Sequence, residues 1–307
     1  MKVLVTGAAG VMGNHLVRGL FERGHEVRCL VLPRDPQRAA LERLGAEVRE
    51  GNVSDAASLA GLCDGVDTVY HLAAVILSHD PSVFTRVNLD GTRHLVQLAA
   101  EAGVRHFIYV SSASVTYPRL TPYAASKLAA EQSVRAESRF SYTIVRPTLV
   151  YDETGGQEFV IFRDHLERFP IVPFIGDGHA LKRPVWAGDV MDGLLRLAGN
   201  PIAYGKLYNF SGGEAISMRE LADLILLHRG KRRLFLHVPV PACRAIAAVS
   251  KRLVARPTLT QNAIDGIVND ANLDPSLACS ELGYRPLGVH AGFERCFPRG
   301  PTVPSAL

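Results

Sequence analysis

The chain has 307 residues, 47% of them apolar, and a formal net charge of +4, which suits one large domain or a large and a small one. No apolar run approaches the length of a membrane span, and the first residues lack the length and cleavage pattern of a secretory signal. The cysteines lack CxxC spacing, so we expect reduced, mostly structural thiols in a cytoplasmic protein and no metal site. They are Cys29, Cys63, Cys243, Cys279 and Cys296.

The start of the chain has the pattern of a nucleotide-binding unit. A β-branched run at Lys2–Thr6 leads into a glycine-rich turn, a helical pattern to about Arg23 and a second strand at Glu26–Leu32. This order is typical of a dinucleotide-binding βαβ unit. In such a turn the glycines allow tight bending, approach of the backbone to a pyrophosphate, and packing of the helix on the strand. These roles fall to Gly7, Gly10 and Gly13 respectively.

Strands and helices alternate through the first half of the chain. We expect strands at Glu47–Glu50, Thr68–Leu72, Phe107–Ser111 and Tyr142–Arg146, and helices at Asp55–Gly61, Asn88–Glu101 and Tyr123–Ala136. The alternation predicts an α/β fold with a Rossmann-type doubly wound parallel sheet. An NAD(P)-binding domain is therefore expected over residues 1–152.

The pattern loosens beyond Glu153, where a smaller C-terminal α/β lobe that binds the substrate is expected over residues 153–307. Its expected elements are helices at Gln157–Phe169, Ser217–His228 and Ala242–Val254 and a strand at Leu234–Val238. Ser217 and Glu220 have the spacing of a capping box.

Ser112, Tyr123 and Lys127 are the candidate catalytic residues. Tyr123 and Lys127 are spaced i and i+4, which places them on one face of a helix. A phenol ionises near pH 10, and a neighbouring ammonium lowers its pKa by favouring the phenolate. A decrease of about three units takes about 4 kcal/mol, which the ammonium and a positively charged nicotinamide could supply together. Such a tyrosine exchanges a proton with a secondary alcohol while hydride passes to or from the cofactor, and Ser112 can hold the same oxygen.

The order of the motifs along nearly the whole chain resembles the extended short-chain dehydrogenase/reductase family, also called the NAD-dependent epimerase/dehydratase family. After the glycine turn come HLAA at His71–Ala74, N-x-x-G-T at Asn88–Thr92, the serine strand at Val110–Ser114, the Tyr123–Lys127 pair, RPxxVY at Arg146–Tyr151, Asp189-Val190 and Tyr208-Asn209-Phe210. The resemblance implies that segments near 187–210 return to the first domain. It also implies a homodimer formed through Asn88–Glu101 and Tyr123–Ala136.

The resemblance implies NAD as the cofactor, held mainly by the glycine turn and by the ends of the strands. The residues expected to bind it are Gly7, Ala9, Gly10, Val11, Met12, Gly13, Arg34, Asn52, Val53, Leu72, Ala73, Ala74, Asn88, Val110, Tyr123, Lys127 and Pro147.

Several positions depart from the family pattern. The second strand ends without the acidic residue that binds the ribose 2′-hydroxyl, and Arg34 could pair with a 2′-phosphate, so NADP stays open beside NAD. Asn52 stands where an aspartate is common near the adenine, and it can still accept a hydrogen bond. The interval from Ser112 to Tyr123 is shorter than in typical sugar-nucleotide epimerases, and Asp152 stands where glycine is usual.

Ser112, Ala113, Arg183 and Trp186 are the expected substrate-binding residues. Arg183 resembles the arginine with which the family grips its substrate, and a guanidinium suits a diphosphate because its fork is bidentate. An ordinary surface arginine is the equal alternative, and packing is the simpler role for Trp186.

Residues 228–257 carry many basic side chains and no acidic one. A solvated basic face is the simplest interpretation, and an anionic or lipid-associated substrate is the alternative. Pro241–Val254 could also lie against a membrane as an amphipathic helix. No nucleic-acid partner is indicated, because no reading module accompanies the stretch.

The resemblance favours a nucleotide-sugar epimerase or dehydratase, whose small-molecule partner is a nucleotide-sugar. The first alternative is a 3β-hydroxysteroid-dehydrogenase-like or dihydroflavonol-reductase-like enzyme with net redox turnover, which the missing acid of the second strand and the SSAS sequence at Ser111–Ser114 support. The second alternative is a non-catalytic NAD(P)-binding assembly protein, against which the retained Tyr123 and Lys127 argue.

Overall fold

The chain forms two compact units. The computed structural model describes residues 1–153, 156–253 and 259–297. The first unit comprises Met1–Pro147, Val190–Phe210 and Asp274–Tyr284, and the second comprises Thr148–Asp189, Ser211–Leu273 and Arg285–Leu307. The first unit is therefore assembled from three stretches of sequence, the last of which the sequence analysis did not anticipate.

A seven-stranded sheet in the order β11-β6-β5-β4-β1-β2-β3 forms the centre of the first unit. All of its neighbouring strands pair in parallel. The doubly wound parallel sheet predicted from the sequence is thus confirmed. In chain order the strands are β1 (Lys2–Thr6), β2 (Glu26–Val31), β3 (Glu47–Glu50), β4 (Thr68–His71), β5 (His106–Val110), β6 (Ser141–Pro147) and β11 (Lys206–Phe210).

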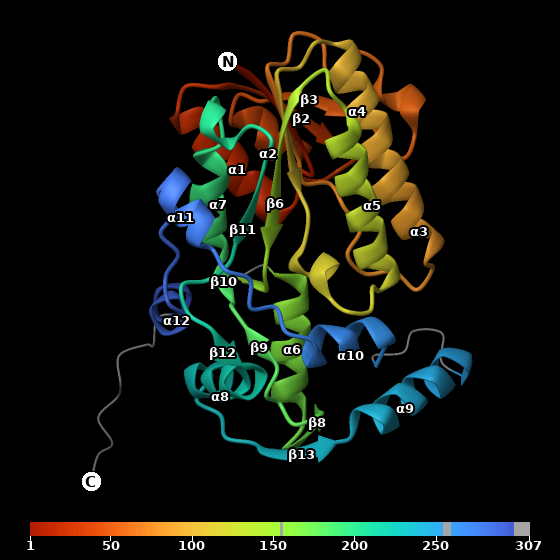
Figure 1. The fold of residues 1–307 in the computed structure, drawn as a ribbon, viewed down its shortest axis with the longest axis vertical. Helices are drawn as coiled ribbons and strands as arrows, with labels where there is room; N and C mark the ends of the chain where they lie inside the picture. Colours follow the sequence, from red (N-terminus) through yellow and green to blue (C-terminus); the bar gives the residue numbers. More distant parts are fainter. Residues whose placement is uncertain (154–155, 254–258, 298–307) are drawn as a thin grey trace. The chain divides into compact units, whose positions relative to one another are not determined.

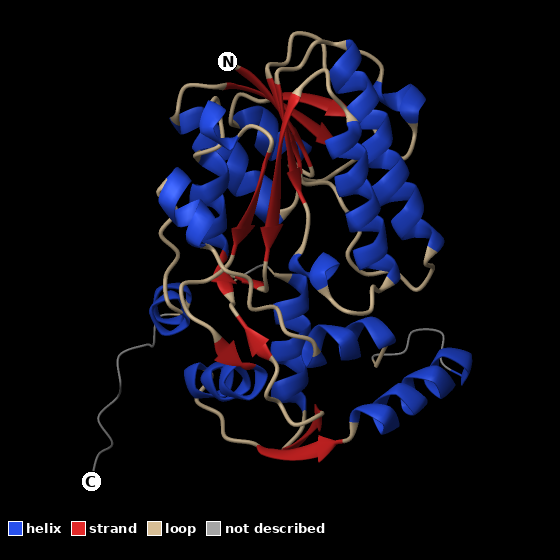
Figure 2. Cartoon of the chain, in the orientation of Figure 1, coloured by secondary structure: helices blue, strands red, loops and turns tan. Residues whose placement is uncertain are grey.

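Helices lie against both faces of this sheet (Figures 1 and 2). The helices α4 and α5 lie on one face, and α1, α7 and α11 lie on the other. Since both faces are covered, β1 and β5 are buried along most of their length, which explains their continuous apolar runs. The helices of this unit are α1 (Val11–Glu22), α2 (Arg38–Arg43), α3 (Ser82–Phe84), α4 (Gly91–Glu101), α5 (Pro122–Ala136), α7 (Ala187–Leu195) and α11 (Ser276–Leu282).

The direction of winding reverses between β1 and β4, which are neighbours in the sheet. Ligands of doubly wound sheets bind outside the carboxyl ends of the strands at such a switch point. The glycine turn follows β1 and the HLAA motif ends β4, so the fold brings these two predicted cofactor segments together. Gly7 adopts φ +74°, and a Cβ there would lie 2.8 Å from the backbone nitrogen of Ala73.

Two predicted helices of the first unit take another form. The segment Asp55–Gly61 contains only a 3₁₀ turn, η1 (Ala56–Leu59), which Asp55 caps by accepting a hydrogen bond from the N–H of Ala57. The predicted helix from Asn88 begins inside a π-helical turn, η2 (Thr85–Asp90), which continues directly into α4. Two further 3₁₀ turns are η3 (Ala113–Thr116) and η4 (Pro201–Ala203).

The second unit has a core of its own, built around Tyr151, Phe159, Leu221 and Phe293. The predicted capping box of Ser217 and Glu220 is present, and β13 has the predicted bounds. Val254, the last residue of the predicted helix Ala242–Val254, lies outside the described residues. The elements are β7 (Val150–Tyr151), β8 (Ile171–Ile175), β9 (Leu181–Lys182), β10 (Val185–Trp186), β12 (Ile216–Ser217), β13 (Leu234–Val238), α6 (Gln157–Arg168), α8 (Met218–His228), α9 (Val240–Leu253), α10 (Gln261–Val268) and α12 (Val289–Cys296).

None of the helices described is long and apolar enough to cross a membrane. Within the described residues, no group of three or more histidine, cysteine, aspartate or glutamate residues could hold a metal ion.

We predict that Gly13→Ala destabilises the first unit. A Cβ at residue 13 would lie 2.1 Å from the carbonyl oxygen of Gly7, a backbone atom that cannot move without disturbing the turn. We expect a loss of about 1–3 kcal/mol in the free energy of unfolding, measured by urea denaturation.

Gly266→Ala in α10 is the control, because a Cβ there meets nothing within 4 Å. This substitution should be neutral or stabilising by about 0.5–1 kcal/mol. Equal effects of the two substitutions would contradict the packing argument.

Candidate active site

The first turn of α1 offers backbone N–H groups at the carboxyl end of β1. Its N-cap residue is Gly10, and no side chain caps the helix or supplies an acidic group in its first turn. The N–H groups and the positive end of the helix dipole therefore stay available for a phosphate. Ala9 and Met12 are half-buried beside the exposed Gly10 and Val11, while Gly13 is buried against Gly7. These residues fit a pyrophosphate.

The segment after β4 is held in place by Asn88. The side chain of Asn88 accepts a hydrogen bond from the N–H of Val75 at 2.8 Å and donates to the carbonyl of Val75 at 3.0 Å. It also donates to Oγ of Ser126 at 3.1 Å, and Ser126 donates to the carbonyl of Tyr123 at 2.7 Å. Asn88 thus connects the strand end at Leu72, Ala73 and Ala74 with the helix that carries the catalytic candidates.

His71 is a buried, neutral part of the same region. Its ring nitrogens lie 2.7 Å from Oγ1 of Thr6 and 2.9 Å from Oγ1 of Thr92. Because Thr92 donates its proton to the carbonyl of Asn88 at 2.6 Å, Nε2 of His71 must be the donor to Thr92, and Nδ1 accepts from Thr6. Burial, with a smaller contribution from the charge of Lys127, lowers the pKa of His71 to about 3.

Lys127 is a buried charged group of the candidate site. Its side chain is 2% exposed. Its Nζ atom donates to the carbonyl of Val110 at 2.6 Å and lies 4.3 Å from the centre of the Tyr109 ring. Burial lowers the pKa of Lys127 to about 7, while the nearby carboxylate of Glu131 acts in the opposite direction. The ammonium is thus fixed beneath α5 at the end of β5.

Glu131 and Arg146 form a second ionic layer behind Lys127. Arg146 donates from Nε and Nη2 to the two carboxylate oxygens of Glu131 at 2.9 and 2.7 Å. Glu131 is 1% exposed, so this bidentate pair ties α5 to β6 away from solvent. Arg146 is part of a family motif in the sequence, whereas Glu131 was not predicted, and its only sequence signal is its position four residues after Lys127.

The start of α5 sets the position of Tyr123. Thr121 caps the helix by accepting a hydrogen bond from the N–H of Ala124, and Pro122 occupies the first helical turn. Tyr123 follows at once, one helical turn before Lys127 and on the same face. Its ring is half-buried and meets the ring of Phe84 edge to face, with centroids 6.1 Å apart.

Ser112 stands at the end of β5 as the cap of η3. Its Oγ accepts from the N–H of Ser114 at 3.2 Å and lies 3.0 Å from Oγ of Ser114. Ser111 is buried, whereas Ser112 is half-buried. The next residue, Ala113, is buried in η3. Ser112, Tyr123 and Lys127 therefore all belong to the first unit, on β5 and α5 and the turns that adjoin them.

The remaining cofactor candidates lie at other strand ends of the same unit. Arg34 is exposed beyond β2 with φ +61°, and its N–H lies 3.4 Å from a carboxylate oxygen of Glu50. Oδ1 of Asn52 already accepts from the N–H and the hydroxyl of Ser54. Val53 is buried beside α4, and Pro147 is buried at the end of β6.

Arg183 and Trp186 belong to the second unit. Nε of Arg183 donates to Oδ1 of Asn272 at 2.6 Å, and its Nη1 lies 3.3 Å from the carbonyls of Gly212 and Gly213. The guanidinium is thus already engaged within the lobe. Trp186 packs beneath Gly188 and against the guanidinium of Arg295, which lies 4.7 Å from its ring. The substrate roles of Arg183 and Trp186 stay predictions.

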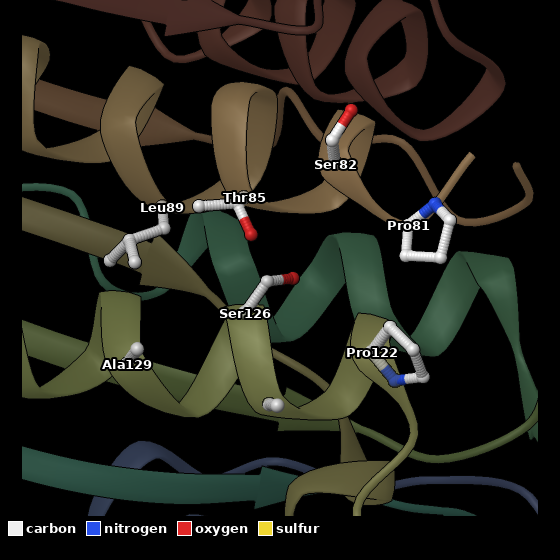
Figure 3. Close-up of a pocket in the computed structure, with 8 residues that line it drawn as sticks. Pro81, Ser82, Thr85, Leu89, Pro122, Ser126 and Ala129 are labelled. Carbon is white, nitrogen blue, oxygen red and sulfur yellow. The ribbon is translucent and has the colours of Figure 1, made fainter.

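An open depression of about 400 Å³ lies on the outer side of α5 (Figure 3). It is formed by residues of α3, η2 and α5 that are mostly small or apolar: Pro81, Ser82, Thr85, Leu89, Pro122, Ala125, Ser126 and Ala129. None of the glycines of the first turn lines it. Ser126 faces this depression and also accepts a hydrogen bond from Asn88, so the helix that carries Tyr123 and Lys127 forms one wall of the depression.

Comparison with known proteins identifies the family. The family model described as the NAD dependent epimerase/dehydratase family matches residues 3–210. The chain belongs to this family, as the sequence predicted. NAD, the cofactor that the resemblance implied, is the one named in the description of the family.

Individual relatives fall into two chemical groups. A 3 beta-hydroxysteroid dehydrogenase/Delta 5→4-isomerase of Mycobacterium tuberculosis is 29% identical, over 97% of this chain and 90% of the relative. A 2-alkyl-3-oxoalkanoate reductase of Stenotrophomonas maltophilia is 29% identical, over 96% and 98%. The solved structure of DesIV, a dTDP-glucose 4,6-dehydratase of Streptomyces venezuelae with NAD and TYD bound, is 27% identical with a TM-score of 0.76, over 97% and 96%.

We predict that His71 makes the stability of the protein depend on pH. The pKa of His71 is about 3 in the folded protein and about 6.5 in an unfolded chain, so the unfolded state binds the proton first as the pH falls. This contribution to stability is complete above pH 6.5 and decreases below it, by about 1.4 kcal/mol per pH unit. Urea unfolding between about pH 6 and pH 4 measures the slope.

His71→Gln should reduce that slope by about 1.4 kcal/mol per pH unit, whatever it does to stability at neutral pH. His79→Gln is the control, since His79 is exposed and should leave the slope unchanged. An unchanged slope in His71→Gln would show that His71 is not buried in its neutral form.

Proposed function

We propose that the chain catalyses reversible oxidation of a secondary alcohol on an apolar small molecule, with net turnover of the nicotinamide cofactor. Tyr123 acts as the acid/base, Lys127 lowers the pKa of Tyr123, and Ser112 orients the reacting oxygen. The observation that carries this proposal is the burial of the Lys127 ammonium one helical turn from Tyr123.

A buried cation of this kind favours ionisation of the Tyr123 phenol. In water an ammonium interacts weakly with a phenolate, but burial reduces solvent screening and strengthens their attraction. The Val110 carbonyl holds Nζ of Lys127, and Glu131 favours its charged form. Lys127 therefore stabilises the phenolate of Tyr123 over the phenol.

Three residues of the chain and the bound cofactor have distinct roles in the proposed reaction. Bound NAD supplies the hydride acceptor or donor. In the oxidation direction, Tyr123 removes the proton from the substrate hydroxyl, and in reduction it returns a proton to the carbonyl oxygen. Ser112 donates a hydrogen bond to the same oxygen, which orients the carbon that exchanges hydride. Loss of the Tyr123 hydroxyl removes the proton transfer and leaves the binding groups in place.

The relatives support the choice of an apolar substrate with net redox chemistry. The steroid dehydrogenase and the alkyl-oxoalkanoate reductase are both aligned over nearly the full chain. The engaged guanidinium of Arg183 also offers less to a diphosphate than the sequence suggested. We therefore rank this subclass above the nucleotide-sugar enzymes that the sequence motifs favoured.

A nucleotide-sugar epimerase or dehydratase is the second candidate. The similarity to DesIV, over 97% of the chain, supports it. In such an enzyme the cofactor is reduced and reoxidised within one catalytic cycle and does not need to leave.

A homodimer through α4 and α5 belongs to the same proposal. The depression beside α5 is open, and its lining of small and apolar groups would admit the side chains of a second helix pair. Alanine residues such as Ala125 and Ala129 allow helices to approach closely.

We predict that Tyr123→Phe lowers kcat by about 10²–10⁴-fold. Phenylalanine keeps the ring contact with Phe84 and removes only the hydroxyl, so the affinity for NAD should stay within a small factor. Turnover is measured with a panel of 3β-hydroxysteroids and aliphatic secondary alcohols, and NAD binding by calorimetry. Tyr142→Phe, which changes a half-buried tyrosine outside the candidate site, is the matched control. Unchanged activity of Tyr123→Phe would refute the proposed role.

We predict that the purified protein carries little tightly bound NAD and that it oxidises added alcohol with stoichiometric formation of NADH. Net turnover requires the cofactor to exchange in every cycle, whereas an epimerase retains it. NAD released on denaturation is measured with an enzymatic assay that reduces it to NADH, and net turnover is measured as the absorbance of NADH formed in the presence of substrate. Retained NAD without net NADH formation would favour the nucleotide-sugar candidate.

A further inference from the structure

The ribbon of β8 and β13 in the second unit is apolar on both faces. Leu234 pairs with Ile171, and Leu236 pairs with Pro173. Val172 and Phe174, which alternate with these residues, are buried in the core of the lobe. The opposite face is open, with Leu234 71% exposed, Leu236 59% and Ile171 55%. A ribbon with one solvated face normally carries polar residues there.

The helix α9, which follows β13, shows the same anomaly. Cys243 and Ala247 face inward and pack against Ile264 of α10. The exposed positions are also apolar and follow at helical spacing: Ala242, Ala245, Ile246 and Val249. Ile246 is 51% exposed and Val249 56%. A surface helix of a globular protein usually presents charged residues on its outer side.

These two apolar faces adjoin each other. Val238 and Ile175 form the last pair on the open face of the ribbon, and both pack against the cluster of Cys243, Ala247 and Ile264. The helix α9, which follows β13 (Figure 1), therefore packs over the end of that face, while Ile171, Leu234 and Leu236 stay exposed. We call the whole the apolar surface: Ile171, Pro173, Leu234, Leu236, Ala242, Ala245, Ile246 and Val249.

An excess of positive charge accompanies the apolar surface. Residues 229–256 include eight lysines and arginines and no aspartate or glutamate. Arg229 and Lys231 share the single carboxylate of Glu167, and Arg244 pairs with Asp265. Within the described ranges, neither Arg232 nor Arg233 pairs with a carboxylate. Exposed apolar side chains bordered by unneutralised cations are the features of a protein surface that binds an anionic membrane.

We propose that the apolar surface docks on the surface of an anionic phospholipid bilayer. The apolar side chains enter the boundary between headgroups and acyl chains, and the exposed Arg232 contacts the lipid phosphates, while Arg233 donates to the carbonyls of Glu167 and Arg232. The protein lies on the membrane and does not span it. A second copy of the chain fits less well, because two surfaces with the same excess of positive charge repel each other. This inference goes beyond the proposed function and does not depend on Tyr123.

The test is co-sedimentation of the full chain with vesicles. We expect binding to vesicles made from equal amounts of phosphatidylcholine and phosphatidylglycerol, weaker binding at higher salt, and little binding to phosphatidylcholine alone. Ile246→Ser should weaken the binding. Ile202→Ser is the matched control, because Ile202 is 53% exposed in the first unit and should have no effect.

A second pair of variants tests the charges. Arg232→Gln should weaken vesicle binding about fivefold, as expected for one cation near an anionic surface. Arg43→Gln, which removes an exposed arginine of α2 in the first unit, should not. Absence of binding to the mixed vesicles, or equal binding by Ile246→Ser and Ile202→Ser, would overturn the proposal. Self-association that Ile246→Ser abolishes would assign the surface to a second copy, and binding to an acidic protein but not to vesicles would assign it to a protein partner.

Discussion

The buried ammonium of Lys127 is the interaction on which the proposed chemistry depends. An ion removed from water is costly unless other groups replace its hydration. Here the Val110 carbonyl, the face of the Tyr109 ring and the charge of Glu131 replace part of that hydration, and burial still lowers the pKa of Lys127 to about 7. Arg146 in turn neutralises Glu131. Lys127 and Glu131 on α5, Arg146 on β6 and the Val110 carbonyl on β5 are thereby fixed relative to one another. These contacts also fix the position of Tyr123, because Tyr123 lies on α5.

The glycine turn imposes the second constraint, which acts through the backbone. The strands β1 and β4 end side by side, and the turn after one touches the segment after the other. Asn88 then connects that segment to α5 through Val75 and Ser126. The groups suited to the cofactor and the candidate catalytic residues therefore belong to one unit, and any displacement of α5 would separate Tyr123 from the nicotinamide that we expect beside it.

The sequence predicted the parts whose signal is local. The strands β1, β2, β4, β5 and β6 follow from segments rich in apolar residues, and α8 follows from a capping box. The strand β3 and the helix α5 follow from the alternation of strands and helices. The segment Asp55–Gly61 was predicted as a helix and contains only a 3₁₀ turn, in which the N–H and the hydroxyl of Ser58 both donate to the carbonyl of Asp55. The strands β7, β9, β10 and β12 were not predicted, since two-residue strands carry no periodic pattern, and neither was α2, whose six residues are too few to show a helical repeat.

Candidate site residues were predictable where a spacing or motif carries the chemistry, as for Ser112, Tyr123 and Lys127. Glu131, Ser126 and Val75 were missed because their importance comes from burial and from partners distant in sequence. For Arg183 the motif was misleading. It suggested a guanidinium available to substrate, whereas the guanidinium donates to Asn272 and to the carbonyl of Gly212. The exposure of apolar residues on β13 and α9 could not be predicted from the sequence. The sequence shows that these residues are hydrophobic, but it does not show which face of the strand or helix packs against the core.

The central claim is that Lys127 lowers the pKa of Tyr123, and titration of that phenol tests it most directly. The ionisation of Tyr123 is obtained as the difference in ultraviolet absorbance between the native protein and Tyr123→Phe, both saturated with NAD, as the pH is raised. The account predicts a pKa well below the ordinary value of about 10, returning towards 10 in Lys127→Met. A pKa near 10 in both proteins would contradict it.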